Sequence, residues 1–245
     1  MFPRLPKITQ TLLIANVVLF LLQQLPQTAG IFTQLMLWPL GSQQFFADSP
    51  GFEPWQLLSY GFLHGGFPAL LLYLSGLLVC KAFAFCGFAA ESDLLHDLGD
   101  LFFQMLALFM FGAPLEMTWG EKRFLTYYMV CVVGAGLCQL LVAAFAGEYN
   151  PVLGASGGVF GLLLAYGMLF PNQRVMLLFP PIPMKARTFV IVFGAIELLL
   201  GFTGWQPGVA HFAHLGGMLF GWLLIRYWRG QPPFNKRGPH LRRVK

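Results

Sequence analysis

The chain has 245 residues, of which 57% are hydrophobic and only 10% are Asp, Glu, Lys or Arg. A soluble domain carries roughly 25% charged residues, so this composition excludes a disordered protein, a disulfide scaffold and an ordinary cytosolic enzyme. It indicates a polytopic membrane protein that lies in a lipid bilayer. The net charge of +5 does not indicate nucleic-acid binding, because no basic face coincides with base-stacking aromatic residues.

Six apolar stretches have the composition of membrane-spanning helices, which need about 20 apolar residues. In chain order they are residues 8–28, 101–119, 124–146, 154–171, 188–203 and 208–228. The fifth is short for a full crossing and contains Glu197, which we interpret either as a polar pore residue or as a neutral, hydrogen-bonded side chain. The predicted fold class is an all-α membrane protein, with a six-helix bundle forming one domain over residues 8–230.

Basic residues are concentrated on one side of this predicted topology. With the N-terminus inside, six crossings place residues 120–123, 172–187 and 231–245 on the same side, and all three segments contain Lys or Arg. The loops on the other side carry no Lys or Arg over residues 30–60, 147–153 and 204–207. Because basic loops face the cytoplasm, residues 1–7 and the basic tail 231–245 are both predicted to be cytoplasmic, in a bacterial inner membrane.

A further apolar segment, residues 67–90, lies between the first two predicted spans and contains Lys81. A single crossing by this segment would place every later basic loop on the outside, against the charge pattern. We therefore expect it to be re-entrant or interfacial, within a long external loop over residues 30–98. The alternative is a true seventh transmembrane helix with inverted downstream topology.

The first candidate functional motif is a G-x-S-G run that contains Gly154, Ser156 and Gly157. It places a serine hydroxyl beside unhindered backbone N–H groups at the predicted start of a helix, where developing negative charge is favoured. Gly157 and Gly161 are four residues apart and give this helix a small-residue face. Taken alone, the motif is more typical of close helix packing than of catalysis.

The second motif places His211 and His214 at the start of the last apolar stretch. A histidine within a spanning helix is costly and therefore indicates function. His214, Gly217 and Gly221 share one helical face, which could dock against the glycine face behind Ser156 and bring an imidazole to the hydroxyl. A metal pair formed by the two histidines is the weaker alternative, because no nearby Cys or Glu completes it; we expect neither a metal nor a cofactor.

Together these motifs resemble those of the rhomboid family of intramembrane serine proteases. The resemblance extends over about residues 50–230. It also includes a loop motif around Trp55, within residues 53–65, and the helix over residues 101–116, in the order that the family has them.

This resemblance implies a six-helix core with a Ser–His dyad, without an acidic third member, in a water-filled cavity. By the family pattern Ser156 is the nucleophile, and His214 rather than His211 is the catalytic base. Phe160, one turn after the serine, lies where the family places an aromatic ring against the catalytic histidine.

The chain departs from the rhomboid pattern where the second helix usually carries H-x-x-x-N, whose side chains help to bind the oxyanion. Here these positions are Asp100 and Gln104. Gln104 keeps an amide donor, whereas an ionised Asp100 would repel the tetrahedral intermediate, and losing one oxyanion donor costs about 10²–10³ in rate. We assign these two residues, with Gly154 and Gly157, to support of the site and expect reduced activity. The apolar insert 67–90 is a second departure.

The sequence therefore predicts a serine-type endopeptidase that cleaves transmembrane or membrane-proximal segments of single-span membrane proteins. The alternative is a catalytically impaired rhomboid-like protein that binds transmembrane helices, which the altered oxyanion positions favour. A small transporter or channel ranks last, because such proteins need charged residues at the midplane and paired broken helices, and only Glu197 fits. The oligomeric state is left open.

Overall fold

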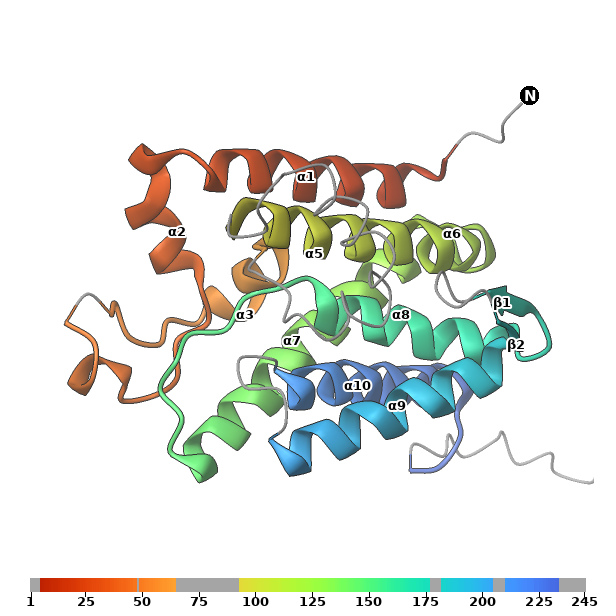
Figure 1. Cartoon of the computed structure of the whole chain (residues 1–245). Coiled ribbons are helices and arrows are strands. Elements are labelled where there is room, and N and C mark those ends of the chain that lie inside the picture. The colour runs from red at the N-terminus through yellow and green to blue at the C-terminus, as the bar shows by residue number, and fades with distance from the viewer. Residues whose placement is uncertain (1–4, 48, 65–92, 177–181, 205–209, 234–245) are drawn as a thin grey trace, which may run out of the picture.

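A computed structural model describes residues 5–47, 49–64, 93–176, 182–204 and 210–233 of the chain. The long helices lie side by side in a bundle, with the short helices of the first loop at one end (Figure 1). The helices are α1 (Lys7–Gln23), α2 (Ala29–Leu35), α3 (Gln56–Ser59), α5 (Asp93–Ala107), α6 (Ala113–Trp119), α7 (Glu121–Ala146), α8 (Ser156–Leu169), α9 (Ala186–Thr203) and α10 (His211–Arg229). The predicted all-α class is confirmed.

Each of the six predicted apolar stretches forms a helix in the described residues, but not each is long enough to cross a bilayer by itself. Three segments meet that criterion: Leu98–Trp119, Glu121–Ala146 and Ala186–Thr203. The first helix, Lys7–Gln23, forms a pair with Pro26–Leu35 that is bent by 98°. The six-span topology therefore stays a prediction, and the apolar segment 67–90 lies outside the described residues.

Three local features were not predicted from the sequence. A π-helical turn, Leu108–Gly112, joins α5 to α6, and α5 itself begins at Asp93, ahead of the predicted start at residue 101. The apolar pattern locates the stretch that lipid can accommodate, whereas the helix continues through the polar residues before it. Between α8 and α9, strands β1 (Arg174–Met176) and β2 (Pro183–Lys185) form a short antiparallel hairpin.

Glycines allow α10 to pack directly on α7 and α8. A Cβ atom on Gly217 would overlap the carbonyl group of Gly157, and one on Gly221 would overlap the hydroxyl of Tyr127. Gly161 lies against Cys131 of α7 in the same way. Because no side chain separates the backbones at these positions, α10 approaches α8 more closely than ordinary packing permits.

A buried carboxylate ties the beginning of α1 to α6. Glu116 accepts hydrogen bonds from the backbone N–H groups of Ile8 and Thr9, at 2.9 and 2.7 Å, and from the Thr9 hydroxyl at 2.7 Å. The first N–H groups of a helix have no partner within the helix, and their partial positive charge favours an anion. Glu116 thus caps α1 from a different part of the chain and fixes the first helix on the bundle.

The loop that precedes α8 is held by the α3 region. The backbone N–H of Gly154 donates to the carbonyl of Tyr60 at 3.0 Å, and the Tyr60 hydroxyl donates to the carbonyl of Val132 in α7 at 2.7 Å. Leu37 and Val152 exchange two backbone hydrogen bonds of 2.9 Å. These contacts fix the backbone two residues before Ser156, the residue at which α8 begins.

Candidate active site

The structure brings Ser156 and His214 together at the closest approach of α8 and α10. Ser156 is the first residue of α8, and His214 lies in the first turn of α10. The distance between Ser156 Oγ and His214 Nε2 is 2.8 Å, which is a hydrogen bond. The contact between Gly157 and Gly217 determines this distance, because Gly157 follows the serine directly and Gly217 lies one turn after the histidine.

Phe160 covers one face of the His214 ring. The two ring centroids are 4.3 Å apart and the planes are inclined by only 9°, so the rings are stacked. Phe160 lies one turn after Ser156 on α8, and the same helix therefore supplies both the hydroxyl and the surface against which the imidazole rests. This stacking restricts rotation of the His214 ring about its terminal torsion, which is otherwise broad.

Gly154 has a backbone conformation that other residues rarely adopt. Its φ angle is +139°, and a Cβ atom built there would lie 3.4 Å from Ser156 Oγ. A side chain at this position would therefore be strained and would also press on the hydroxyl. Glycine keeps the approach to Ser156 open on the side of this loop.

Asp100 and Gln104 lie near the site but are paired with each other. Both are buried, and the Gln104 amide donates a hydrogen bond of 2.6 Å to Asp100 Oδ1. The Gln104 Nε2 atom would be 4.0 Å from a Cβ atom on Gly154, so the amide lies at the edge of the site. The expected oxyanion donor is thus engaged with the neighbouring carboxyl group, while Gln104 Oε1 finds no partner among the described residues.

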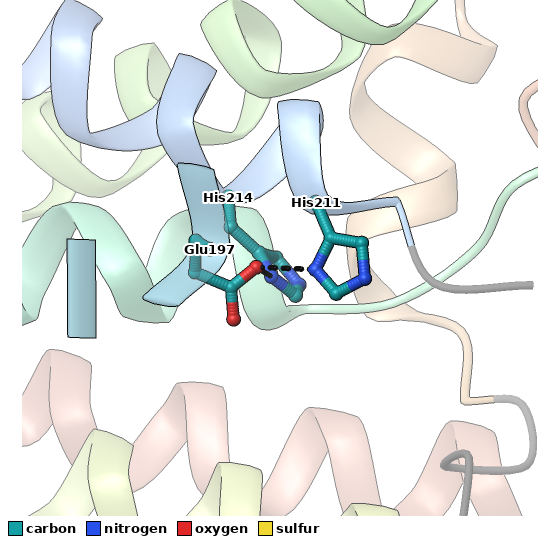
Figure 2. A group of neighbouring side chains, drawn as sticks. All are labelled: Glu197, His211 and His214. Atoms are coloured by element: carbon teal, nitrogen blue, oxygen red, sulfur yellow. Dashed lines mark hydrogen bonds and ion pairs between the residues drawn. The ribbon is translucent and has the colours of Figure 1, made fainter. Parts of the chain in front are cut away.

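Glu197 and His211 complete a buried cluster that the sequence analysis missed (Figure 2). Glu197 Oε2 lies 2.8 Å from His214 Nδ1 and 2.7 Å from His211 Nδ1. The three residues are only 3%, 5% and 4% exposed for Glu197, His211 and His214 respectively. The sequence did contain one indication of this cluster, because a carboxyl group in a spanning helix is itself a sign of function. The sequence pattern did not indicate that Glu197 faces the two histidines.

Contrary to the expectation from the sequence, an acidic side chain does lie near His211 and His214, because Glu197 lies between them. Each of these three residues offers one ligand atom, and the three atoms lie within 4.8 Å of one another, which is close enough for them to share a metal ion. The observed distances nevertheless fit hydrogen bonds. A tetrahedral zinc ion with bonds of about 2.0–2.1 Å separates its ligand atoms by about 3.3 Å, whereas the carboxylate oxygen is 2.7 and 2.8 Å from the two nitrogen atoms.

Three curated proteins show the extent of the similarity. The chain is 28% identical to mouse "Presenilin-associated rhomboid-like protein, mitochondrial", over 54% of this chain and 36% of that protein. It is 32% identical to "Rhomboid protein 1, mitochondrial" of Saccharomyces cerevisiae, over 50% and 37% of the two chains. With "RHOMBOID-like protein 4" of Arabidopsis thaliana the identity is 30%, over 71% and 34%. The chain thus spans about a third of the length of these relatives.

The predicted location, a bacterial inner membrane with both termini in the cytoplasm, is contradicted by these similarities. The relatives are eukaryotic, and those of mouse and yeast are named as mitochondrial proteins. The charge of the loops distinguishes the two sides of a membrane but carries no information about which membrane it is.

A family model described as the rhomboid domain matches residues 93–230. The matched region runs from α5, which carries Asp100 and Gln104, through α8 to α10, which carries His214. This region is more than half of the chain. It contains Ser156 and the buried cluster of Glu197, His211 and His214. By this match the chain belongs to the rhomboid family.

Proposed function

We propose that this protein is an intramembrane serine endopeptidase in which Ser156 is the nucleophile and His214 the general base. The observation that carries the proposal is the 2.8 Å hydrogen bond between Ser156 Oγ and His214 Nε2. A serine hydroxyl is a weak nucleophile until an adjacent base removes its proton. Membership of the rhomboid family supports the same reaction class.

The reaction follows from this pair. As Ser156 Oγ attacks the carbonyl carbon of the scissile peptide, its proton passes to His214 Nε2 and the carbonyl π electrons move to oxygen. When the intermediate collapses, the C–N bond breaks and His214 donates the proton to the departing amine. A water molecule then attacks the acyl-enzyme, with His214 again taking a proton, and Ser156 is regenerated.

The developing oxyanion requires hydrogen-bond donors. The first backbone N–H groups of α8, at Ser156 and Gly157, have no intrahelical partner, and the positive end of the helix favours negative charge. These groups are the main source of stabilisation in our proposal. Gln104 offers only the amide proton that Asp100 does not accept, so its contribution is small at best.

The substrates that fit this site are segments of other membrane proteins. Ser156 and His214 lie inside a helical bundle whose outer surface carries exposed apolar side chains, for example Ile191 and Phe202 of α9. A substrate must therefore reach the site from the membrane or from its boundary. Single-span membrane proteins can do so because one transmembrane helix can move in the bilayer and unwind locally.

A second candidate function is binding of transmembrane helices without efficient cleavage. The specific observation in its favour is the hydrogen bond between Gln104 and Asp100, which withdraws a donor from the oxyanion and leaves a carboxyl group nearby. Loss of one such donor costs about 10²–10³ in rate. We rank this function second because Ser156 and His214 still form the hydrogen bond that a nucleophile and its base require.

Cleavage of a transmembrane reporter in liposomes separates these two functions. Wild-type protein should release the product, whereas Ser156→Ala and His214→Ala should not. A fluorophosphonate should label Ser156 in the wild type. In His214→Ala it should label Ser156 much more slowly. Reporter binding without cleavage and without labelling would favour the second function.

A further inference from the structure

We propose that Glu197 is a positioning residue. It extends the Ser156–His214 pair to a hydrogen-bonded row of three residues, Ser156–His214–Glu197, which we call the relay, and His211 holds Glu197 in place. This inference deepens the proposed function and rests on it. The rhomboid pattern has a Ser–His dyad without an acidic member, so this arrangement goes beyond what the resemblance implied. It is carried by one carboxylate oxygen that lies between two buried imidazoles (Figure 2).

The carboxylate fixes the tautomers of both histidines. An ionised carboxylate can only accept hydrogen bonds, so the Nδ1 atoms of His211 and His214 must each carry a proton to donate to Glu197 Oε2 at 2.7 and 2.8 Å. In neutral His214 the Nε2 atom is then bare. The 2.8 Å contact with Ser156 must therefore run from the hydroxyl to Nε2, which is the direction that a general base requires.

Glu197 also stabilises the charge that appears during the reaction. When His214 takes the serine proton it becomes an imidazolium ion, whose Nδ1–H already points at the carboxylate. The pair is buried, and electrostatic interactions are stronger there than in water. Glu197 keeps its negative charge throughout and takes no proton, as in the Ser–His–Asp triad.

His211 supports the carboxylate from the other side. Its Nδ1 is 2.7 Å from the same oxygen that binds His214, and the planes of the two imidazole rings are perpendicular, at 90°. His211 Nε2 has no hydrogen-bond partner among the described residues. The side chain therefore acts on the site through Glu197, and its loss should weaken catalysis less than the loss of Glu197.

Steady-state kinetics of Glu197→Gln test the relay. The amide has nearly the same shape but no charge, so we expect kcat to fall by about 10²–10⁴-fold, in line with replacements of triad aspartates, while KM stays nearly constant. Glu116→Gln is the matched control, because Glu116 is also a buried glutamate with several hydrogen bonds. It should lower the melting temperature and leave kcat unchanged below that temperature.

Two further measurements separate positioning from a structural role. In a Ser156→Ala background, which should cleave nothing, Glu197→Gln should leave binding of the reporter unchanged, whereas a structural role of Glu197 would weaken that binding. In ¹⁵N-histidine-labelled wild-type protein, the His211 and His214 signals should show protonated Nδ1 atoms with downfield protons. Both protons should move upfield in Glu197→Gln.

Several results would overturn the inference. A kcat of Glu197→Gln within about twofold of wild type, or a loss confined to KM, would exclude the relay. Unprotonated Nδ1 atoms in the wild type would exclude the hydrogen bonds, and stoichiometric metal removed by a chelator from wild type but absent from Glu197→Gln would replace them with a metal site. If the wild type cleaves nothing, the proposed function fails, and the NMR spectra still decide the arrangement around Glu197.

Discussion

Gly217→Ala tests whether the approach of α10 to α8 builds the site. A Cβ atom at this position would lie 2.8 Å from the carbonyl carbon of Gly157 and still closer to its oxygen. Carbon atoms in contact are normally about 3.5–4.0 Å apart, so the two helices must separate by about 1 Å. The Ser156–His214 distance of 2.8 Å would then exceed hydrogen-bond length.

The expected loss of kcat is about 100-fold, which is the typical cost of a 1 Å misplacement of catalytic groups. Overpacking of this kind also costs about 1–3 kcal/mol of stability. The measurements are reporter cleavage in liposomes and thermal unfolding in detergent. Gly194→Ala is the matched control, because its new methyl group would meet only the flexible end of Met218, at 3.4 Å. Wild-type activity in Gly217→Ala would refute this account of the helix contact.

Substitutions at four other residues have defined outcomes, and the last of them is read from the dependence of stability on pH. Asp100→Asn should raise kcat, because it replaces the carboxyl group that binds Gln104, the expected oxyanion donor, with a neutral amide; an unchanged or lower reporter rate would contradict this. Glu116→Ala should destabilise the protein by at least about 2 kcal/mol, because it leaves two backbone donors and a hydroxyl unpaired at the start of α1, and an unchanged melting temperature would show that the cap is dispensable. Phe160→Ala should lower kcat by up to about tenfold, since a stacked ring pair is worth about 0.5–1.5 kcal/mol, and Phe160→Tyr should retain the wild-type rate; equal rates in the two variants would argue against stacking. Burial lowers the pKa of the His64 imidazole to about 4, so the unfolded chain binds the proton more readily and stability should fall as pH drops from about 6.5 toward 4; His64→Gln should reduce this dependence in melting curves, and an identical pH profile would exclude it.

Sequence periodicity and composition predicted the long helices of the fold but not their ends. Each of the six predicted spans forms a helix in the described residues, because main-chain groups in lipid must be satisfied within the segment itself. The polar beginning of α5, at Asp93, and the hairpin of β1 and β2 were not predicted. The hydropathy of a segment encodes neither feature.

The glycine spacings indicated which faces of α8 and α10 could meet. Gly157 and Gly217 come together because small residues on two helices permit a close approach wherever the helices are long enough to align. The juxtaposition of Ser156 and His214 was predictable for this reason, since each residue has a fixed place relative to its glycine. Their catalytic role stays a prediction.

The surroundings of this pair were decided by the tertiary structure. The sequence identified Glu197 as a costly polar residue in a spanning helix and Gln104 as an amide donor, but not their partners. Whether a side chain on one helix faces a neighbour depends on the rotation of each helix about its axis and on the turn between them. In the folded chain Glu197 reaches both His211 and His214, whereas Gln104 turns to Asp100. The sequence by itself thus determined the helices and the pairing of Ser156 with His214, and only the packing of α5, α9 and α10 determined which hydrogen bonds surround this pair.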